Sequence, residues 1–295
     1  MSRTVTAGLD GSAESVAAAD WAAREALLRS LPLRLVHAGD QPPYGYVPFA
    51  GETVAPPDVD RAASMLHEVG VSLTRRHPGL LVTSGRPAGR PAVALTEAAS
   101  EAEVLVLGSR GLGRAAGHLL GSVASAVVAR AEQPVVLVRV ADERRPDDAG
   151  TATAFPADPY RDVAVGLDLH DPPADTVLEF AFDAAARRGG TLRVIHGWSP
   201  SATRAGRGPE EPDVEHGELL TDALRPWREK FPQVEVAEEP VIGTAGAHLV
   251  DASHHVSLVV VGRGRRSAPL GPRIGPVTHQ VLREAVAPVA VVPHD

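Results

Sequence analysis

A glycine-rich segment in the first half of the chain has the residue types and the spacing of a phosphate-binding site. Gly108, Gly111, Gly121 and Ser122 form the pattern G-x-x-G-x9-G-S. Glycines allow a backbone to approach a ligand closely and to adopt positive φ. Gly121 and Ser122 directly precede a helical stretch. Ser122 is predicted to cap that helix, and the N–H groups at its start favour an anion. The chemistry indicated is phosphate binding by backbone amides.

Two other interpretations compete for this segment. A mobile glycine loop followed by an ordinary serine cap would show the same spacing. Residues 111–116, GLGRAA, also fit the dinucleotide fingerprint G-x-G-x-x-A. That fingerprint opens the first strand–helix unit of a domain and is followed by a strand that ends in an acidic residue. Here the unit is the last of its domain and Glu132 precedes its strand, so we reject the fingerprint.

The composition excludes several other classes of function. The chain of 295 residues has one lysine, Lys230, outside any glycine-rich turn, which excludes a P-loop and argues against a Schiff-base enzyme. It has no cysteine, which excludes thiol catalysis and thiolate metal sites. A net charge of −8, spread along the chain, argues against a nucleic-acid or anionic-membrane surface. Without a long apolar run or a signal-peptide pattern, a cytoplasmic protein is predicted.

The sequence that surrounds the glycine segment occurs twice. VTAGLD at 5–10 returns as VAVGLD at 163–168, LRLVHA at 33–38 as LRVIHG at 192–197, and VLVLG at 104–108 as LVVVG at 258–262. The order is kept and the offset varies only from 154 to 159 residues, as duplication of one domain predicts. We therefore predict domains at 1–141 and 160–295, joined by a Pro- and Asp-rich linker at 142–159.

Within one copy, short apolar runs alternate with helical stretches. In the first copy we predict strands at 4–9, 33–38, 79–84, 104–107 and 135–140, and helices at 13–30, 58–77, 91–101 and 122–131. This alternation predicts an α/β fold with a doubly wound parallel sheet, in which ligands bind beyond the carboxyl ends of the strands. Asp10 and Gly108 both follow such strand ends and are expected to face one cleft.

These segments resemble the universal stress protein family, in the tandem form abundant in actinobacteria. The resemblance covers both copies and is carried by GLDGS at 8–12, LRLVHA at 33–38, GSRG at 108–111, GSV at 121–123 and PVVLV at 134–138. The family's ATP-binding signature, G-x-x-G-x9-G-[S/T], is matched in full by residues 108–122. The resemblance implies two adenine-nucleotide α-hydrolase-like sheets of five strands in the order 3-2-1-4-5. It also implies that their last strands pair between the domains as an intramolecular pseudo-dimer, and it leaves a homodimer open.

The resemblance also implies roles for individual residues. The residues implied to border the adenosine are Gly8, Leu9 and Asp10, with Ala38 offering backbone to the adenine. Those implied to line the ribose and the first phosphate are Leu107, Gly108, Arg110 and Gly111. Those implied to bind the outer phosphates, together with Mg²⁺, are Gly121, Ser122, Val123 and Ala124.

The second copy departs from the signature. Its equivalent candidates are Asp168, Gly197, Gly262 and Gly275. Arg265 replaces the middle glycine, and Pro276 replaces the serine, which removes one donor N–H and one hydroxyl. Four arginines could replace those contacts by charge or form a solvated basic loop: Arg263, Arg265, Arg266 and Arg273. We predict an intact first site and a degenerate second one. His37 and His196, which follow the same strand in both copies, are interpreted as strand-end contacts.

The sequence favours a binding module over an enzyme, because nothing in it supplies a base poised beside a phosphate. Bound ATP would report energy or stress state by shifting a loop or an assembly equilibrium, and the loops at 39–57 and 199–212 are the predicted movable parts. Two alternatives stay open. One is a slow ATPase or self-phosphorylating enzyme with Ser122 as a candidate acceptor, and the other is a dimerisation scaffold without a ligand. The sequence identifies no regulatory protein partner.

Overall fold

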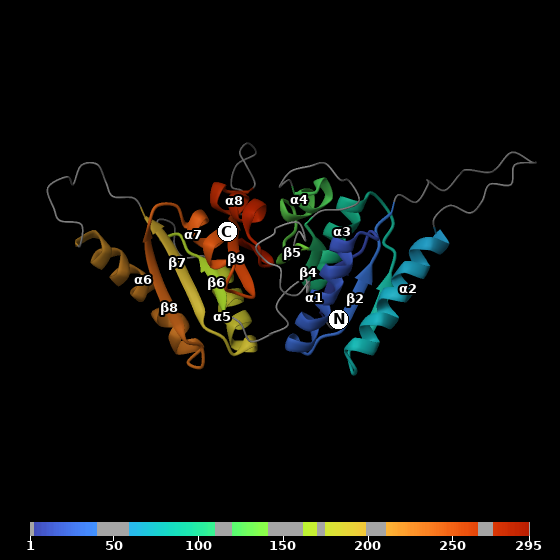
Figure 1. The fold of residues 1–295 in the computed structure, drawn as a ribbon, viewed down its shortest axis with the longest axis horizontal. Helices are drawn as coiled ribbons and strands as arrows, with labels where there is room; N and C mark the ends of the chain where they lie inside the picture. The colour runs from blue at the N-terminus through green and yellow to red at the C-terminus, as the bar shows by residue number, and fades with distance from the viewer. Residues whose placement is uncertain are drawn as a thin grey trace, which may run out of the picture. The chain divides into compact units, whose positions relative to one another are not determined.

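The computed structural model describes residues 3–39, 59–109, 120–140, 162–169, 175–198, 211–264 and 274–294. Backbone contacts divide the chain into unit 1, Met1–Arg139, and unit 2, Val140–Asp295, whose elements are labelled in Figure 1. The predicted linker at 142–159 lies outside the described residues.

Unit 1 alternates strands with helices throughout its described part. The elements are β1 Thr4–Gly8, α1 Ala13–Arg29, β2 Leu33–Val36, α2 Val59–Arg76, β3 Val82–Gly85, α3 Pro91–Ser100, β4 Ala102–Gly108, α4 Ser122–Val128 and β5 Val135–Val138. All strand pairs are parallel, in the order β3-β2-β1-β4-β5. The carboxyl ends of β1 and β4 therefore meet at the point where the strand order reverses.

Unit 2 repeats this topology. Its elements are β6 Val163–Gly166, α5 Asp175–Arg188, β7 Leu192–Trp198, α6 Glu211–Lys230, β8 Val236–Ile242, α7 Ala245–Ala252, β9 Leu258–Gly264, α8 Pro276–Glu284 and β10 Val289–His294. Its parallel strand order is β8-β7-β6-β9-β10. The predicted α/β fold class, with five parallel strands in the order 3-2-1-4-5 in each copy, is confirmed. The pairing of the last strands between the two domains stays a prediction.

Strand β4 has a continuous apolar run from Val104 to Leu107 because helices cover both of its faces. Val104, Leu105, Val106 and Leu107 are each 5% exposed or less. Successive side chains of a strand point to opposite faces, so in a strand with one face exposed to water, apolar residues would alternate with polar ones. Here α1 packs on β1 and β4, and α3 also packs on β1 and β4. The described helices include none with the length and apolar character needed to cross a membrane.

Local sequence signals set the two ends of α1. Ser12 has extended backbone angles and its side chain accepts the N–H of Ser15, which makes it the N-cap. At the other end, Ser30 adopts the left-handed conformation, with φ 54°, and its N–H returns to carbonyls of the last turn. The buried face between these caps is built from alanines, which allow the helix to pack closely on the sheet.

Candidate functional site

Asp10 stands at the carboxyl end of β1, where its carboxylate organises the turn into α1. Its Oδ1 accepts the backbone N–H of Ser12 at 2.9 Å and the hydroxyl of Ser12 at 2.6 Å. Among the residues described, none donates to its Oδ2, and the side chain is exposed. This second oxygen is therefore available to accept a hydrogen bond from a ligand.

Ser15, which the sequence analysis did not single out, belongs to the same network. Its hydroxyl accepts the N–H of Asp10 at 3.3 Å and donates to the carbonyl of Ser12 at 2.9 Å. Its own N–H donates to the Ser12 hydroxyl at 3.2 Å. A serine three residues after a helix cap is the signal that could have indicated it. These bonds fix Asp10 relative to the first turn of α1.

Leu9 links the ends of β1 and β2 through its backbone. Its side chain is buried, at 3% exposed. Its N–H donates to the carbonyl of Val36 at 2.8 Å, and its carbonyl accepts Nδ1 of His37 at 2.8 Å. Because a carbonyl only accepts, Nδ1 of His37 is the donor in this bond. In unit 2, Nδ1 of His196 makes the equivalent bond to a leucine carbonyl at 3.0 Å, which confirms the strand-end interpretation of both histidines.

Gly8 and Leu107 are packed against each other at the ends of β1 and β4. A Cβ on Gly8 would lie 2.5 Å from Cδ2 of Leu107 and 3.2 Å from Cδ2 of Leu95. Leu107 itself is 5% exposed. Gly8 therefore allows α3 to close onto β1 and β4, and neither residue presents a polar group from its side chain. Ala38, half-exposed just beyond β2, borders the same end of the sheet.

The structural requirement for glycine at position 108 differs from the one expected. The sequence analysis assigned this glycine to close approach of a ligand. In the structure a Cβ on Gly108 would lie 2.9 Å from the carbonyl carbon of Glu14 and 3.0 Å from the nitrogen of Ser15. The residue is glycine because the first turn of α1 crosses the end of β4. The crossing brings the start of α1 to the same strand end as the glycine segment.

The two ends of the glycine segment are joined by a hydrogen bond. The N–H of Gly121 donates to the carbonyl of Ser109 at 3.0 Å, which holds the start of α4 at the carboxyl end of β4. Gly121, with φ −59° and ψ 146°, is the N-cap of α4, and Ser122 is its first helical residue. The prediction that Ser122 caps the helix is therefore wrong, because the extended residue is Gly121. Arg110 and Gly111 lie outside the described residues.

The start of α4 leaves backbone donors without helical partners. The first helical bond runs from the N–H of Ser125 to the carbonyl of Gly121 at 2.9 Å. The N–H groups of Ser122, Val123 and Ala124 thus precede the helical ladder. Ser122 and Val123 are exposed, whereas Ala124 is 5% exposed. An anion that reaches this end meets two accessible amides and one hydroxyl.

In unit 2 the carboxyl end of β7, which is the counterpart of β2, is covered by the chain itself. A Cβ on Gly197 would lie 2.3 Å from the nitrogen of Ala245 and 2.8 Å from the carbonyl oxygen of Gly243. The start of α7 therefore rests directly on the backbone of β7. The flanking side chains are buried, with His196 at 1% and Trp198 at 4% exposed. In unit 1 the equivalent residue in sequence is Ala38, which is half-exposed.

The other candidates of unit 2 also differ from their counterparts. Asp168 is exposed at the end of β6, as Asp10 is at the end of β1. A Cβ on Gly262 would lie 2.9 Å from the ring of His294, and the carbonyl of Gly262 accepts the hydroxyl of Thr278 at 2.8 Å. Gly275 is the N-cap of α8, which begins at Pro276 without an N–H.

The arginines proposed to compensate in unit 2 divide into two groups. Arg263 is 7% exposed and lies within β9, so it does not belong to a solvated basic loop. The other three, Arg265, Arg266 and Arg273, fall outside the part of the chain that the structure describes.

Gly197→Ala is expected to destabilise unit 2 by about 1–3 kcal/mol, because its Cβ would meet backbone atoms that cannot rotate away. Urea unfolding followed by the fluorescence of Trp198 and Trp227, in a Trp21→Phe background, measures this. The matched control is Ala38→Gly in unit 1, expected to cost no more than about 1 kcal/mol from backbone entropy. Equal stability of Gly197→Ala and the parent would contradict close packing of α7 on β7.

Comparisons with known proteins agree on one family. A family model described as the universal stress protein family matches residues 1–139 and 159–293. Universal stress protein Rv2005c of Mycobacterium tuberculosis is 35% identical over 297 residues, which cover 97% of this chain and 96% of that protein. A solved universal stress protein from Archaeoglobus fulgidus covers 100% of both chains at 19% identity, with a TM-score of 0.69. Another from that organism, solved in complex with dAMP, is 25% identical and covers 46% of this chain and 98% of its own, with a TM-score of 0.35.

Proposed function

This chain belongs to the universal stress protein family, and on that premise we propose that its first unit binds ATP, with Mg²⁺, as a nucleotide-dependent regulator. The observation that carries the proposal is the hydrogen bond from Gly121 to Ser109. It joins the two ends of a signature that is complete in sequence, so that the start of α4 and the end of β4 form one site. Phosphates would accept the N–H groups of Ser122 and Val123.

The adenosine side of the proposed site lies at the ends of β1 and β2. Oδ2 of Asp10 would accept a hydrogen bond from a ribose hydroxyl, since Oδ1 is held by Ser12. Ala38 leaves the end of β2 half-exposed, where an adenine ring could stack or accept backbone contacts.

Magnesium would be held chiefly by the nucleotide. The described residues contain no group of three His, Asp or Glu side chains that could hold a metal ion. Mg²⁺ is commonly bound through substrate phosphates and waters with one or two protein oxygens, so the phosphates and the exposed hydroxyl of Ser122 fit this mode. The ion would neutralise phosphate charge in a unit that has no lysine.

The second unit is proposed to be the degenerate copy. The start of α7 covers Gly197, and Pro276 lacks the donor that Ser122 supplies. The first difference would remove part of the base side of the site, and the second would remove part of the phosphate side. A chain with one competent unit would bind one ATP.

We propose binding and signalling rather than catalysis. Oδ1 of Asp10 is engaged by Ser12 and Nδ1 of His37 by the carbonyl of Leu9, so both side chains are held as parts of the local backbone structure. A ligand regulates by its differential affinity for two states, and ATP would act by favouring one state of the chain. Phosphate release by the purified protein tests this. Turnover that Gly121→Val abolishes would contradict a binding-only role.

Binding of ATP is expected to stabilise unit 1 by about 2.7 kcal/mol at a concentration 100-fold above Kd. Thermal unfolding followed by Trp21 fluorescence, with Trp198 and Trp227 replaced by phenylalanine and Mg²⁺ present, measures the shift. Calorimetry is expected to give one site per chain. The absence of any shift would remove the nucleotide proposal. Two equal sites would contradict the degenerate second unit while leaving the first unit's site intact.

A further inference from the structure

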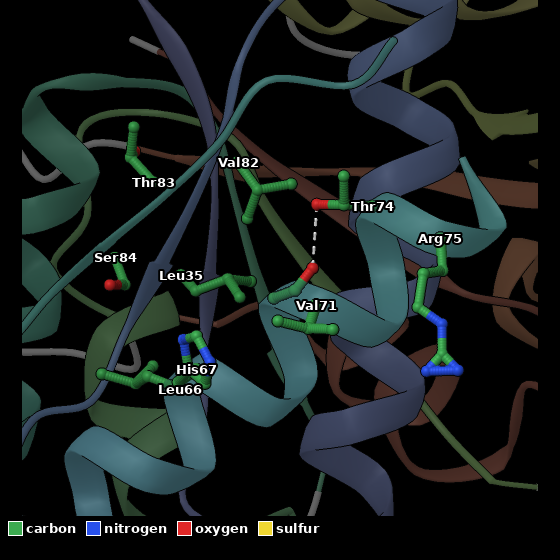
Figure 2. Close-up of a pocket in the computed structure, with 10 residues that line it drawn as sticks. Leu35, Leu66, His67, Val71, Thr74, Arg75, Val82, Thr83 and Ser84 are labelled. Atoms are coloured by element: carbon green, nitrogen blue, oxygen red, sulfur yellow. Dashed lines mark hydrogen bonds between the residues drawn. The ribbon is translucent and has the colours of Figure 1, made fainter. Parts of the chain in front are cut away.

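A pocket of about 330 Å³ lies in unit 1 between α2 and the strands β2 and β3, away from the proposed nucleotide site. Its apolar floor is formed by Leu35, Leu66 and Val82, and Leu35 and Leu66 are 0% and 4% exposed. Figure 2 shows Leu35 and Val82 on the strands and Leu66 on the helix, around the same space. The pocket therefore has a buried aliphatic floor.

The pocket exists because a large side chain is missing from α2. Val82 of β3 pairs with the first residue of β2, and Val236 of β8 pairs with the first residue of β7. The two valines are therefore equivalent, and they are 154 residues apart in the sequence. The same offset matches Gly70 of α2 with Leu224 of α6, whose side chain is 0% exposed. A Cβ on Gly70 would meet nothing closer than 3.8 Å. Unit 2 fills with leucine the space that unit 1 leaves open.

The mouth of the pocket is also closed in unit 2 and open in unit 1. In unit 2, Glu238 of β8 accepts Arg228 at 2.7 Å and the hydroxyl of Thr221 at 2.6 Å, both from α6. In unit 1, the residues 154 positions before Glu238, Arg228 and Thr221 are Ser84, Thr74 and His67. All three of these unit 1 residues are exposed. The Thr74 hydroxyl turns back to its own helix and donates to a carbonyl there at 2.9 Å (Figure 2). No described hydrogen bond spans the mouth in unit 1.

Strand β3, which lines the pocket, is the edge strand among the described strands of unit 1. Within the described residues of unit 1, β3 pairs only with β2, so its other edge offers unpaired N–H and C=O groups. Its sequence, VTSG, has no charge and no proline. The edge strand of unit 2, β8, contains Pro240, which lacks an N–H for pairing with a further strand, and the charged residue Glu239. Glu239 accepts a hydrogen bond from Arg193, and this bond raises the pKa of the Arg193 guanidinium above its ordinary value. Leu81, just before β3, is 66% exposed.

We propose that unit 1 binds an extended, uncharged peptide segment that pairs with the open edge of β3 and places a leucine-sized side chain in the pocket beside Gly70. The aliphatic floor of the pocket would accept a leucine side chain, as the equivalent space in unit 2 holds Leu224. The unpaired edge of β3 would form main-chain hydrogen bonds with the peptide. Backbone hydrogen bonds would give affinity and the pocket would give side-chain selectivity, as in other cases of strand addition. The proposal does not depend on nucleotide binding.

The test uses the full ¹⁵N-labelled chain and the peptide acetyl-Ser-Thr-Leu-Thr-Ser-amide. Saturable shifts are expected in the amides of Val82–Gly85 and of Gly70. The counterpart with alanine in place of leucine is expected to bind at least about tenfold more weakly, because most of the buried aliphatic surface is lost. Absence of shifts at β3, or equal affinity of the two peptides, would overturn the proposal.

Variants copied from unit 2 separate the pocket from the edge. Gly70→Leu fills the floor, and Thr74→Arg combined with Ser84→Glu closes the mouth with the ion pair seen between Arg228 and Glu238. Both are expected to abolish binding of the leucine peptide. The matched control is Gly217→Leu in α6, where an added Cβ meets nothing within 4 Å, and it is expected to leave binding unchanged. Undiminished binding by both pocket variants would overturn the proposal.

Two other occupants would give distinguishable results. If isobutanol shifted the floor residues as the peptide does, with no change in the outer amides of β3, the pocket would belong to a small aliphatic molecule. If sedimentation showed self-association that Gly70→Leu abolishes, the occupant would be a second copy of this chain. Either result would overturn the assignment to a peptide segment.

Discussion

Glu25→Ala is expected to destabilise unit 1 by about 3–5 kcal/mol, because it removes the charge partner of a buried arginine. Nε of Arg29 donates to Oε1 of Glu25 at 2.6 Å, and the two side chains are 3% and 1% exposed. Glu103 is more distant, at 3.7 Å from Nη1 of Arg29, and is 33% exposed. Loss of Glu25 would leave the guanidinium buried without its nearest counter-charge.

The fluorescence of Trp21 provides a reporter for this effect. Trp21 lies one turn before Glu25 on α1 and is 7% exposed, and replacing Trp198 and Trp227 with phenylalanine leaves it as the only tryptophan. Glu25→Gln, which keeps an acceptor, is expected to lose less stability. The double variant Glu25→Ala with Arg29→Leu is expected to recover most of the loss, because it removes the buried charge as well. A double variant no more stable than Glu25→Ala would show that packing, rather than charge, dominates.

The fold could be predicted from the sequence because its signals are local and occur twice. Continuous apolar runs such as Val104–Leu107 indicate strands covered on both faces, and the alternation with helices fixes the parallel arrangement. The second copy repeats these runs in the same order, which makes a chance pattern untenable. Boundaries were less well defined: α4 ends at Val128, whereas its helical stretch was expected to reach Ala131.

The site was predictable as a set of strand ends but not as a set of contacts. The reason that Gly108 is glycine is the backbone of Glu14, which is far away in sequence and crosses it only in the fold. In the same way, nothing near Gly197 in the sequence indicates that Ala245 will cover it. Spacing locates glycines, but whether a ligand or the chain itself occupies the space beside them is decided by long-range packing.

Comparison of the two copies offers information that neither copy gives alone. Gly70 is an ordinary helical glycine until it is set beside Leu224, and Ala38 is an ordinary alanine until it is set beside Gly197. The first difference leaves a pocket in unit 1, and the second accompanies a strand end that α7 covers in unit 2. After duplication, each unit serves as a structural control for the other. The differences concentrate at the proposed nucleotide site and at the edge of β3.

Ser122→Pro is expected to weaken ATP binding by about 10- to 100-fold, because a hydrogen bond to a charged group contributes roughly 1.5–3 kcal/mol. The change removes the N–H and the hydroxyl of Ser122 together. The fold is expected to be retained, since Ser122 is the first residue of α4 and its N–H precedes the helical ladder. Unit 2 already contains this arrangement, with Pro276 as the first residue of α8 after its N-cap Gly275.

Calorimetry with ATP and Mg²⁺ measures the affinity, and two further variants locate the lost contact. Ser122→Ala keeps the N–H and removes the hydroxyl, so it is expected to account for only part of the effect. The reciprocal Pro276→Ser restores a donor to unit 2 but leaves α7 resting on Gly197, so the stoichiometry is expected to stay at one. If Ser122→Pro bound ATP as tightly as the parent, the phosphates would not lie at the start of α4. If Pro276→Ser created a second site, the degeneracy of unit 2 would reside in the helix start and not in the covered strand end.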